Sequence, residues 1–128
     1  MAKKQDLTFN KNEDTNKLLV AEMKRRFEEV SLGGGKKRIE KLHAKGKMTA
    51  RERIAYLLDD GANQIEIGAF AGDDMYQEHG GCPSGGVVGV IGYVKGRQCI
   101  VVAYDATVKA GAWFPITGKK NLRLQEIS

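Results

Sequence analysis

The sequence predicts a mixed α/β fold of the α+β type, in which amino-terminal helices are followed by a β-hairpin and a final helix. Three observations predict it: apolar residues at helical spacing in the first half, a capping-box pattern that starts at Thr49, and two apolar runs that flank Lys95-Gly96. The 128 residues are 41% apolar and 29% charged. This size and composition are typical of one small globular domain.

The first predicted helix is marked by a single apolar stripe. Residues 1 to about 13 are polar and are expected to be poorly ordered. Beyond them, Leu19, Met23, Phe27 and Val30 recur at spacings that place them on one helical face.

Glycines divide the helical half of the chain. The run Gly33 to Gly35 is expected to end the first helix, because glycine readily adopts the left-handed backbone that closes a helix. A second helix is predicted over residues 36–45, ended by Gly46. A third follows the capping box from Thr49 to Glu52 and is expected to continue to Gly61.

After residue 61 the period changes from helix to strand. Residues 64–67 alternate like a strand, and the glycine-rich residues 71–86 are expected to form a loop. Residues 87–94 and 99–104 are predicted to be the strands of a hairpin whose turn contains Gly96. Residues 100–103 are apolar at every position, which is typical of a strand covered on both faces.

A loop over residues 105–115 and a last helix complete the prediction. Thr117 is expected to cap that helix, and Leu122, Leu124 and Ile127 are its apolar residues. An apolar strand needs covering layers on its faces, and the sequence holds too few of them. We therefore expect a truncated chain, with a tail and helix at residues 1–33 and an incomplete domain at residues 34–128.

The positive charge is concentrated in one segment. The formal net charge is +5, and the stretch from Gly33 to Arg53 holds eight lysines and arginines against two glutamates. Such a segment suits a phosphate-bearing partner, either nucleic acid, an anionic membrane or a phosphorylated cofactor, or it is a solvated face. It has no aromatic residue, which disfavours nucleic acid.

Other motifs carry weaker signals. The run from Gly33 to Lys36 lacks the spacing of a phosphate-binding loop. His79 and Cys82 are too few for a zinc site, and nothing marks Cys82 as an activated thiolate. With no apolar core behind the basic amino terminus, no secretory signal is expected, so the two cysteines are predicted to be reduced thiols in a cytoplasmic protein.

Several long stretches together resemble one family. These are Arg38 to Ile54, Leu57 to Gly61, Glu66 to Gly68, Gly80 to Val88, Asp105 to Gly111 and Phe114 to Lys120. They resemble the amino-terminal part of the carboxyltransferase (β) subunit of biotin-dependent acyl-CoA carboxylases. The last three stretches are most similar to the branch that contains the methylcrotonyl-CoA carboxylase β subunit.

The resemblance implies a crotonase-like (ClpP/crotonase) fold in a large homo-oligomer. It implies transfer of a carboxyl group from carboxybiotin to a short-chain acyl-CoA of the methylcrotonyl or propionyl type, with biotin carboxylase and biotin carboxyl carrier subunits as partners. The family stabilises an enolate with paired backbone N–H groups. The turn that supplies the first of them follows the last predicted helix, so this chain is expected to hold no catalytic residue and to be inactive alone.

Residues for contact with coenzyme A follow from the same resemblance. Lys109 with the backbone of Ala110 and Gly111 is the first choice, since this loop corresponds to the one that approaches the coenzyme in crotonase-like proteins. A second set of candidates for the phosphates is Lys47, Arg51 and Arg53. No metal, membrane or nucleic acid is implied. The alternatives are a non-enzymatic basic module that binds nucleic acid and a decarboxylase subunit of the same family.

Overall fold

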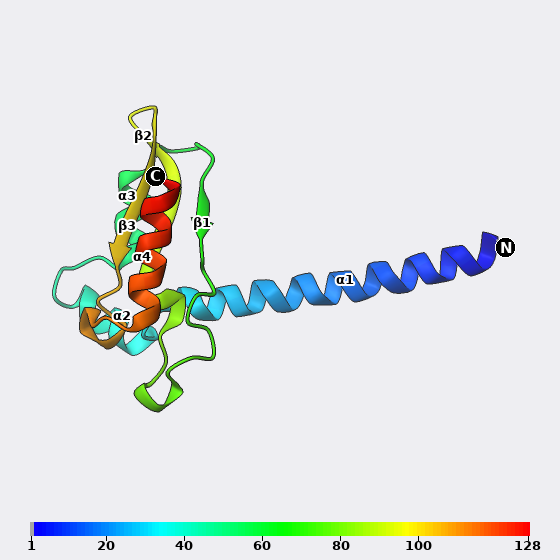
Figure 1. Ribbon diagram of the computed structural model, residues 1–128, viewed down its shortest axis with the longest axis horizontal. Coiled ribbons are helices and arrows are strands. Elements are labelled where there is room, and N and C mark those ends of the chain that lie inside the picture. The colour runs from blue at the N-terminus through cyan, green and yellow to red at the C-terminus, as the bar shows by residue number, and fades with distance from the viewer. Residues whose placement is uncertain (1) are drawn as a thin grey trace.

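The computed structural model describes residues 2–128, with side chains described from residue 6 onward. The helices are α1 (Ala2–Ser31), α2 (Lys36–His43), α3 (Ala50–Leu57) and α4 (Pro115–Ile127), and the strands are β1 (Ile65–Ile67), β2 (Val87–Val94) and β3 (Arg97–Tyr104). Single 3-10 turns lie at Gln77–His79, Pro83–Gly86 and Lys109–Gly111. Figure 1 shows a small body, made of α2 to α4 and the sheet, from which α1 projects. The predicted mixed α/β fold is confirmed.

Helix α1 is much longer than the sequence indicated. The expectation of poor order over residues 1–13 is wrong for residues 2–13, which are helical, and residue 1 lies outside the described part. The stretch has no glycine or proline to interrupt a helix. Ion pairs four residues apart also support it, such as Lys17 with Glu13 at 2.9 Å. Of the predicted stripe only Val30 is buried.

Helices α2 and α3 are short and end slightly before their predicted limits. At α3 the predicted capping box is confirmed: the Glu52 N–H donates to the Thr49 hydroxyl at 3.2 Å, and the Thr49 N–H donates to the Glu52 carboxylate at 2.7 Å. Helix α3 ends at Leu57, because Leu58 already has an extended backbone. Helix α2 ends at His43, three residues before Gly46.

The sheet has three antiparallel strands in the order β1-β2-β3. The hairpin between β2 and β3 turns at Lys95 and Gly96, both with positive φ (52° and 74°), as a tight two-residue hairpin requires. The Asp59 carboxylate accepts both backbone N–H groups of this turn at 2.7 Å. These bonds hold the pKa of Asp59 below its ordinary value. Strand β3 begins at Arg97, two residues earlier than predicted, because the turn is so tight.

Helices cover the two faces of the sheet unequally. On one face Val88 and Val90 of β2 pack with Ala50 and Ile54 of α3 to form the core. On the other face α4 lies against β2, where Leu124 is 1% exposed (Figure 1). Strand β3 is at the sheet edge and its Val102 is 39% exposed. Residues 100–103 are therefore not covered on both faces within this chain, in line with the expectation that the sequence holds too few covering layers.

Helix α4 begins two residues before the predicted cap. Pro115 occupies its first position, where proline loses no helical hydrogen bond. Thr117 is therefore inside the first turn, and its hydroxyl accepts the N–H of Phe114 at 3.1 Å. Of the three predicted apolar residues Leu124 alone is buried; Leu122 and Ile127 are exposed.

Candidate functional site

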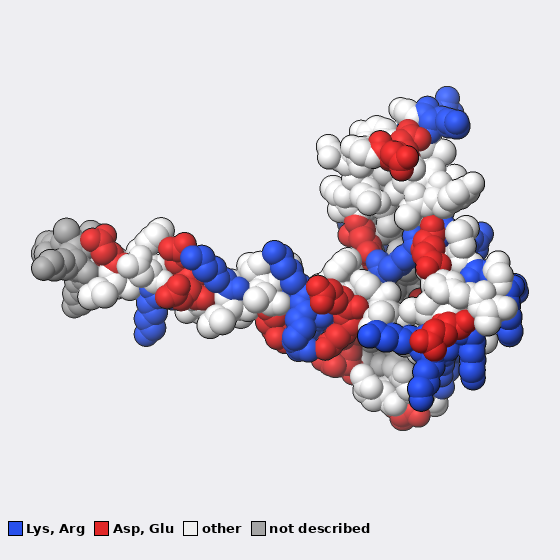
Figure 2. Space-filling view, turned by 180° about the vertical axis from the view of Figure 1, so that it is seen from behind, with Lys and Arg blue, Asp and Glu red and all other residues white. Residues whose placement is uncertain are grey.

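Basic side chains gather on the end of the body where α2 lies. Figure 2 shows lysine and arginine side chains crowded there, with few acidic neighbours. Helix α2 holds itself to the body through half-buried Ile39 and Leu42, so its basic residues point outward. Arg38 and Lys41 are three residues apart on α2, a spacing that places them on one helical face, and Lys45 follows in the turn after the helix.

A groove of about 460 Å³ runs between this face and the loop that follows β3. Its lining residues are Arg38, Lys41, Leu42, Lys45, Ala106, Thr107, Lys109 and Ala110. Four of the eight are cations and none is acidic, so the groove presents a concentrated positive field to a ligand.

The loop is shaped by hydrogen bonds around Asp105. Its carboxylate accepts the backbone N–H of Thr107 at 2.9 Å and the Thr107 hydroxyl at 2.5 Å, and its own N–H donates to the Gly86 carbonyl at 3.0 Å. The backbone then passes through the left-handed region at Lys109 (φ 47°), Ala110 (φ 55°) and Gly111 (φ 84°). Side chains rarely adopt this region, and such residues concentrate at functional sites.

Contacts with the glycine run fix the loop against α2. The Gly34 N–H donates to the Thr107 hydroxyl at 2.9 Å, and the Arg38 guanidinium donates to the Thr107 carbonyl at 3.0 Å. A Cβ on Gly34 would lie 1.8 Å from that carbonyl oxygen, so a glycine is required there. The glycine run thus sets the width of the groove, in addition to ending α1.

The structure brings only part of the predicted site together. Lys109 and Ala110 line the groove, and Gly111 follows directly. Lys47 and Arg53 are exposed on the surface outside its lining. The Arg51 side chain also lies outside the groove lining.

Arg51 is engaged inside the body. Its guanidinium forms a two-pronged ion pair with Glu66, donates to the Ser84 hydroxyl at 3.2 Å, and lies 5.6 Å from the centre of the Phe27 ring. The side chains of Arg51 and Glu66 are only 26% and 13% exposed. The pair therefore joins α3, β1 and the turn before β2.

Sequence reasoning missed Arg38, Lys41 and Lys45 as site residues, although their helical spacing was readable. It also missed Lys120, which is 6% exposed and donates to the carbonyls of Ser84 at 2.7 Å and Val87 at 2.6 Å. Burial lowers the pKa of Lys120 to about 8, the nearby Glu66 opposing this. No pattern in the sequence distinguishes a lysine that becomes buried from one that stays exposed.

The arrangement can bind an anion but offers no reactive group of its own. Burial raises the pKa of the Cys82 thiol, which makes it a poor nucleophile. Among the described residues, no cluster of three or more histidine, cysteine or acidic side chains is suited to a metal ion. Nor does any helix in residues 2–128 have the length and apolar character to cross a membrane.

Comparisons with known proteins identify the family of this chain. The carboxyl transferase domain family matches residues 41–128. A probable mitochondrial methylcrotonoyl-CoA carboxylase β chain from Drosophila melanogaster is 45% identical over 98% of this chain, which covers 22% of the relative. The biotin-dependent 3-methylcrotonyl-coenzyme A carboxylase β1 subunit of Mycobacterium tuberculosis is 40% identical over 90% of this chain and 21% of its own length.

Solved structures show the same fold. The hexameric transcarboxylase 12S, with methylmalonyl-coenzyme A and methylmalonic acid bound, superposes with a TM-score of 0.79 at 31% identity, over 87% of this chain and 22% of that one. The β subunit of Pseudomonas aeruginosa geranyl-CoA carboxylase superposes with a TM-score of 0.72 at 35% identity, over 84% of this chain and 20% of that one. The chain thus spans about a fifth of the length of the relatives it matches. It belongs to the carboxyl transferase domain family of acyl-CoA carboxylases and has part of their crotonase-like fold.

Proposed function

We propose that this chain forms the coenzyme-binding edge of a carboxyltransferase that moves a carboxyl group from carboxybiotin to a short-chain acyl-CoA of the methylcrotonyl or propionyl type. The observation that carries the proposal is the basic groove between α2 and the loop at residues 105–111. Coenzyme A has a diphosphate and a 3′-phosphate, and Arg38, Lys41 and Lys109 offer charge-assisted hydrogen bonds to such groups.

The proposal assigns roles of binding and orientation to this chain. Carboxybiotin, carried by a partner, supplies the carboxyl group. Biotin carboxylase and biotin carboxyl carrier partners, a homo-oligomeric whole protein and a cytoplasmic location belong to the same proposal. The lining of the groove has no carboxylate, imidazole or thiol, so we expect the 128-residue chain to be inactive on its own. Its cations are exposed, so we expect it to bind the coenzyme weakly.

A decarboxylase would use the same groove. Methylmalonyl-CoA decarboxylase subunit α of Propionigenium modestum is 38% identical over 85% of this chain. Carboxylation and decarboxylation both require the coenzyme to be bound, and the lining of the groove does not distinguish the two reactions. The proposal for the groove is therefore a proposal for coenzyme A binding in either case.

The experiment is a titration of the isotope-labelled chain with coenzyme A and with dephospho-coenzyme A, followed by amide chemical shifts. We expect shifts confined to α2 and residues 105–111, and weaker binding without the 3′-phosphate. Arg38→Ala with Lys109→Ala should reduce affinity by roughly two- to thirtyfold, since both side chains are exposed and each exposed charged contact contributes about 0.2–1 kcal/mol. Lys47→Ala with Arg53→Ala removes two cations outside the groove and should change affinity little.

Three outcomes would contradict the proposal. Shifts outside the groove, or equal losses for both double variants, would show that the coenzyme binds elsewhere or through bulk charge. Tighter binding of a DNA or RNA duplex, falling steeply with salt and not displaced by coenzyme A, would favour the basic nucleic-acid module instead.

A further inference from the structure

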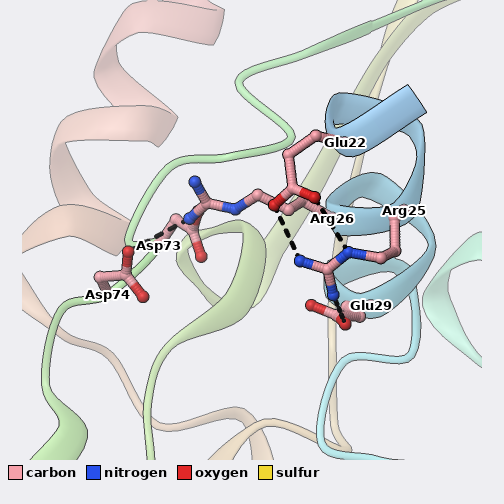
Figure 3. Close-up of polar contacts among 6 residues, drawn as sticks. All are labelled: Glu22, Arg25, Arg26, Glu29, Asp73 and Asp74. Carbon is pink, nitrogen blue, oxygen red and sulfur yellow. Dashed lines mark hydrogen bonds and ion pairs between the residues drawn. The ribbon is translucent and has the colours of Figure 1, made fainter. Parts of the chain in front are cut away.

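Helix α1 is anchored to the body near its carboxyl end, and the rest of its length projects away from the body (Figure 1). Its 30 residues span about 45 Å. At its base Arg26 pairs with Asp73 and Asp74, as Figure 3 shows, while Arg25 turns back to Glu22 and Glu29 of the same helix. The helix therefore leaves the body in a fixed direction (Figure 1).

The packing at this base shows which side of α1 faces the body. Phe27 meets the ring of Phe70 edge-on at 6.4 Å, and Val30 is buried. Both residues belong to the predicted apolar stripe, so the body lies on the stripe side of the helix.

The same stripe continues along the free part of α1 without cover. Phe9 is 68% exposed, Leu19 63% and Met23 52%, and their spacing places them on one face with Val20. Asn12 and Asn16 lie between them on that face, along a shallow groove that also includes Val20. An apolar face of this length on a projecting helix is typical of an interaction surface.

Charges beside the stripe reverse their sign halfway along the helix. On one flank Asp6 and Glu13 precede Lys17 and Lys24. On the other flank the order is opposite, with Lys11 before Glu22. When two such helices pack against each other, the acidic half of a flank can meet a basic half, so a second copy of the same helix is a complementary partner.

We infer that α1 pairs antiparallel with α1 of a second copy of this chain. In an antiparallel pair each flank meets its own counterpart, so that Glu13 lies near Lys17 of the second copy and Asp6 near Lys24 of the second copy, each pair displaced by about 3 Å along the helix axis. In that register Phe9 faces Leu19 of the second copy, and Asn12 faces Asn16 of the second copy. Paired asparagines within an apolar seam select one register.

The position of the body selects the antiparallel direction. A parallel pair would also bring opposite charges together, but it would place both bodies on the stripe side at the same end, in the same space. An antiparallel pair places the bodies at opposite ends. The contact is then two-fold symmetric and closed, so each α1 seam joins two copies. This surface is separate from the basic groove, so the inference does not depend on coenzyme binding.

Sedimentation velocity of the 128-residue chain and of charge variants tests the inference. We expect the unchanged chain to dimerise, and Asp6→Lys with Glu13→Lys to weaken the dimer about tenfold or more, because one flank becomes wholly basic and meets itself. Adding Lys17→Glu and Lys24→Glu to that variant should restore dimerisation, since the flank is again complementary to itself. Asp14→Lys with Glu28→Lys adds the same charge away from the seam and should leave the dimer intact.

The four-charge variant separates the two directions. In a parallel pair its flank would meet Lys11 and Glu22 of the second copy with like charges, so the dimer would stay weak. Circular dichroism shows whether each variant keeps its helix. A monomeric unchanged chain, a dimer insensitive to Asp6→Lys with Glu13→Lys, or a four-charge variant that remains monomeric while helical would each overturn the inference.

Discussion

Lys120 holds the strained turn before β2 from inside the body. Its ammonium donates to the carbonyls of Ser84 and Val87, which enclose Gly85 and Gly86; Ser84 and these two glycines all have positive φ. The next contact along is the Gly86 carbonyl, which accepts the N–H of Asp105 at the start of the groove loop. A buried lysine thus supports the loop that lines the basic groove.

The lowered pKa of Lys120 predicts a rise of stability with pH. Between pH 8 and 10.5 the unfolded chain binds a proton that the folded chain has lost, and stability rises with pH wherever the unfolded state binds more protons. The unfolding free energy contributed by this group should therefore rise by about 3 kcal/mol across that window. Urea denaturation at several pH values, with Lys120→Met as the reference, measures it. A difference between the two chains that stays constant from pH 7 to pH 10.5 would refute the lowered pKa.

Site residues differ in how well the sequence predicts their roles. Lys109 and Ala110 were predicted because a resemblance placed their loop near the coenzyme. Arg38 reaches the groove because Gly34 allows α2 to approach Thr107, and that contact joins residues far apart in the chain. Arg51 looked like a free cation, but pairing with Glu66 across fifteen residues occupies it. Pairings of this kind arise from tertiary packing and leave no local pattern.

At the scale of elements, local signals predicted a capping box and a turn better than they predicted the limits of helices and strands. The capping box at Thr49 and the Lys95-Gly96 turn were both readable, because each depends on residues that are neighbours in sequence. The length of α1 was not, since its first half lacks a covered stripe and its helix is supported by ion pairs at its surface. The apolar run of β3 indicated a strand that needs cover on both faces, but which layers lie over it depends on tertiary packing and not on the run itself.

Two glycines predict opposite effects of the same substitution. Gly89 of β2 faces α4, and a Cβ there would lie 2.5 Å from Leu124, a side chain that is 1% exposed. Gly89→Ala should therefore destabilise the body by about 1–3 kcal/mol through overpacking. Gly118 lies within α4 with its nearest neighbour at 4.0 Å, so Gly118→Ala should stabilise the helix by about 0.5–1 kcal/mol.

Thermal unfolding of the two glycine variants measures both signs at once. If Gly89→Ala were neutral, α4 would not be packed on β2 as described. If Gly118→Ala were also destabilising, the space beside Trp113 would be smaller than the structure shows.

At the scale of the whole molecule, two surfaces remain open for association, and they differ in kind. The seam on α1 matches its own copy and closes after one pairing. The outer edge of β3 is different, because a strand edge can accept any extended chain and then presents a new edge. Tyr104 and Trp113 stack at 5.6 Å at the end of this strand and are 45% and 60% exposed, which adds apolar area beside the edge.

Blocking the β3 edge should reduce irreversible aggregation without abolishing the reversible dimer. Val102→Lys introduces a charge at a position that is 39% exposed, and natural edge strands use lysine to prevent pairing with other chains. Light scattering on heating should show slower aggregation, while sedimentation at room temperature shows the dimer unchanged. Gln98→Lys adds the same charge on the same strand where the residue is already polar, and it should slow aggregation less. If the unchanged chain and Val102→Lys aggregated equally, the surface that causes aggregation would not be the β3 edge. If Val102→Lys lost the reversible dimer, the dimer contact would lie on the sheet and not on α1.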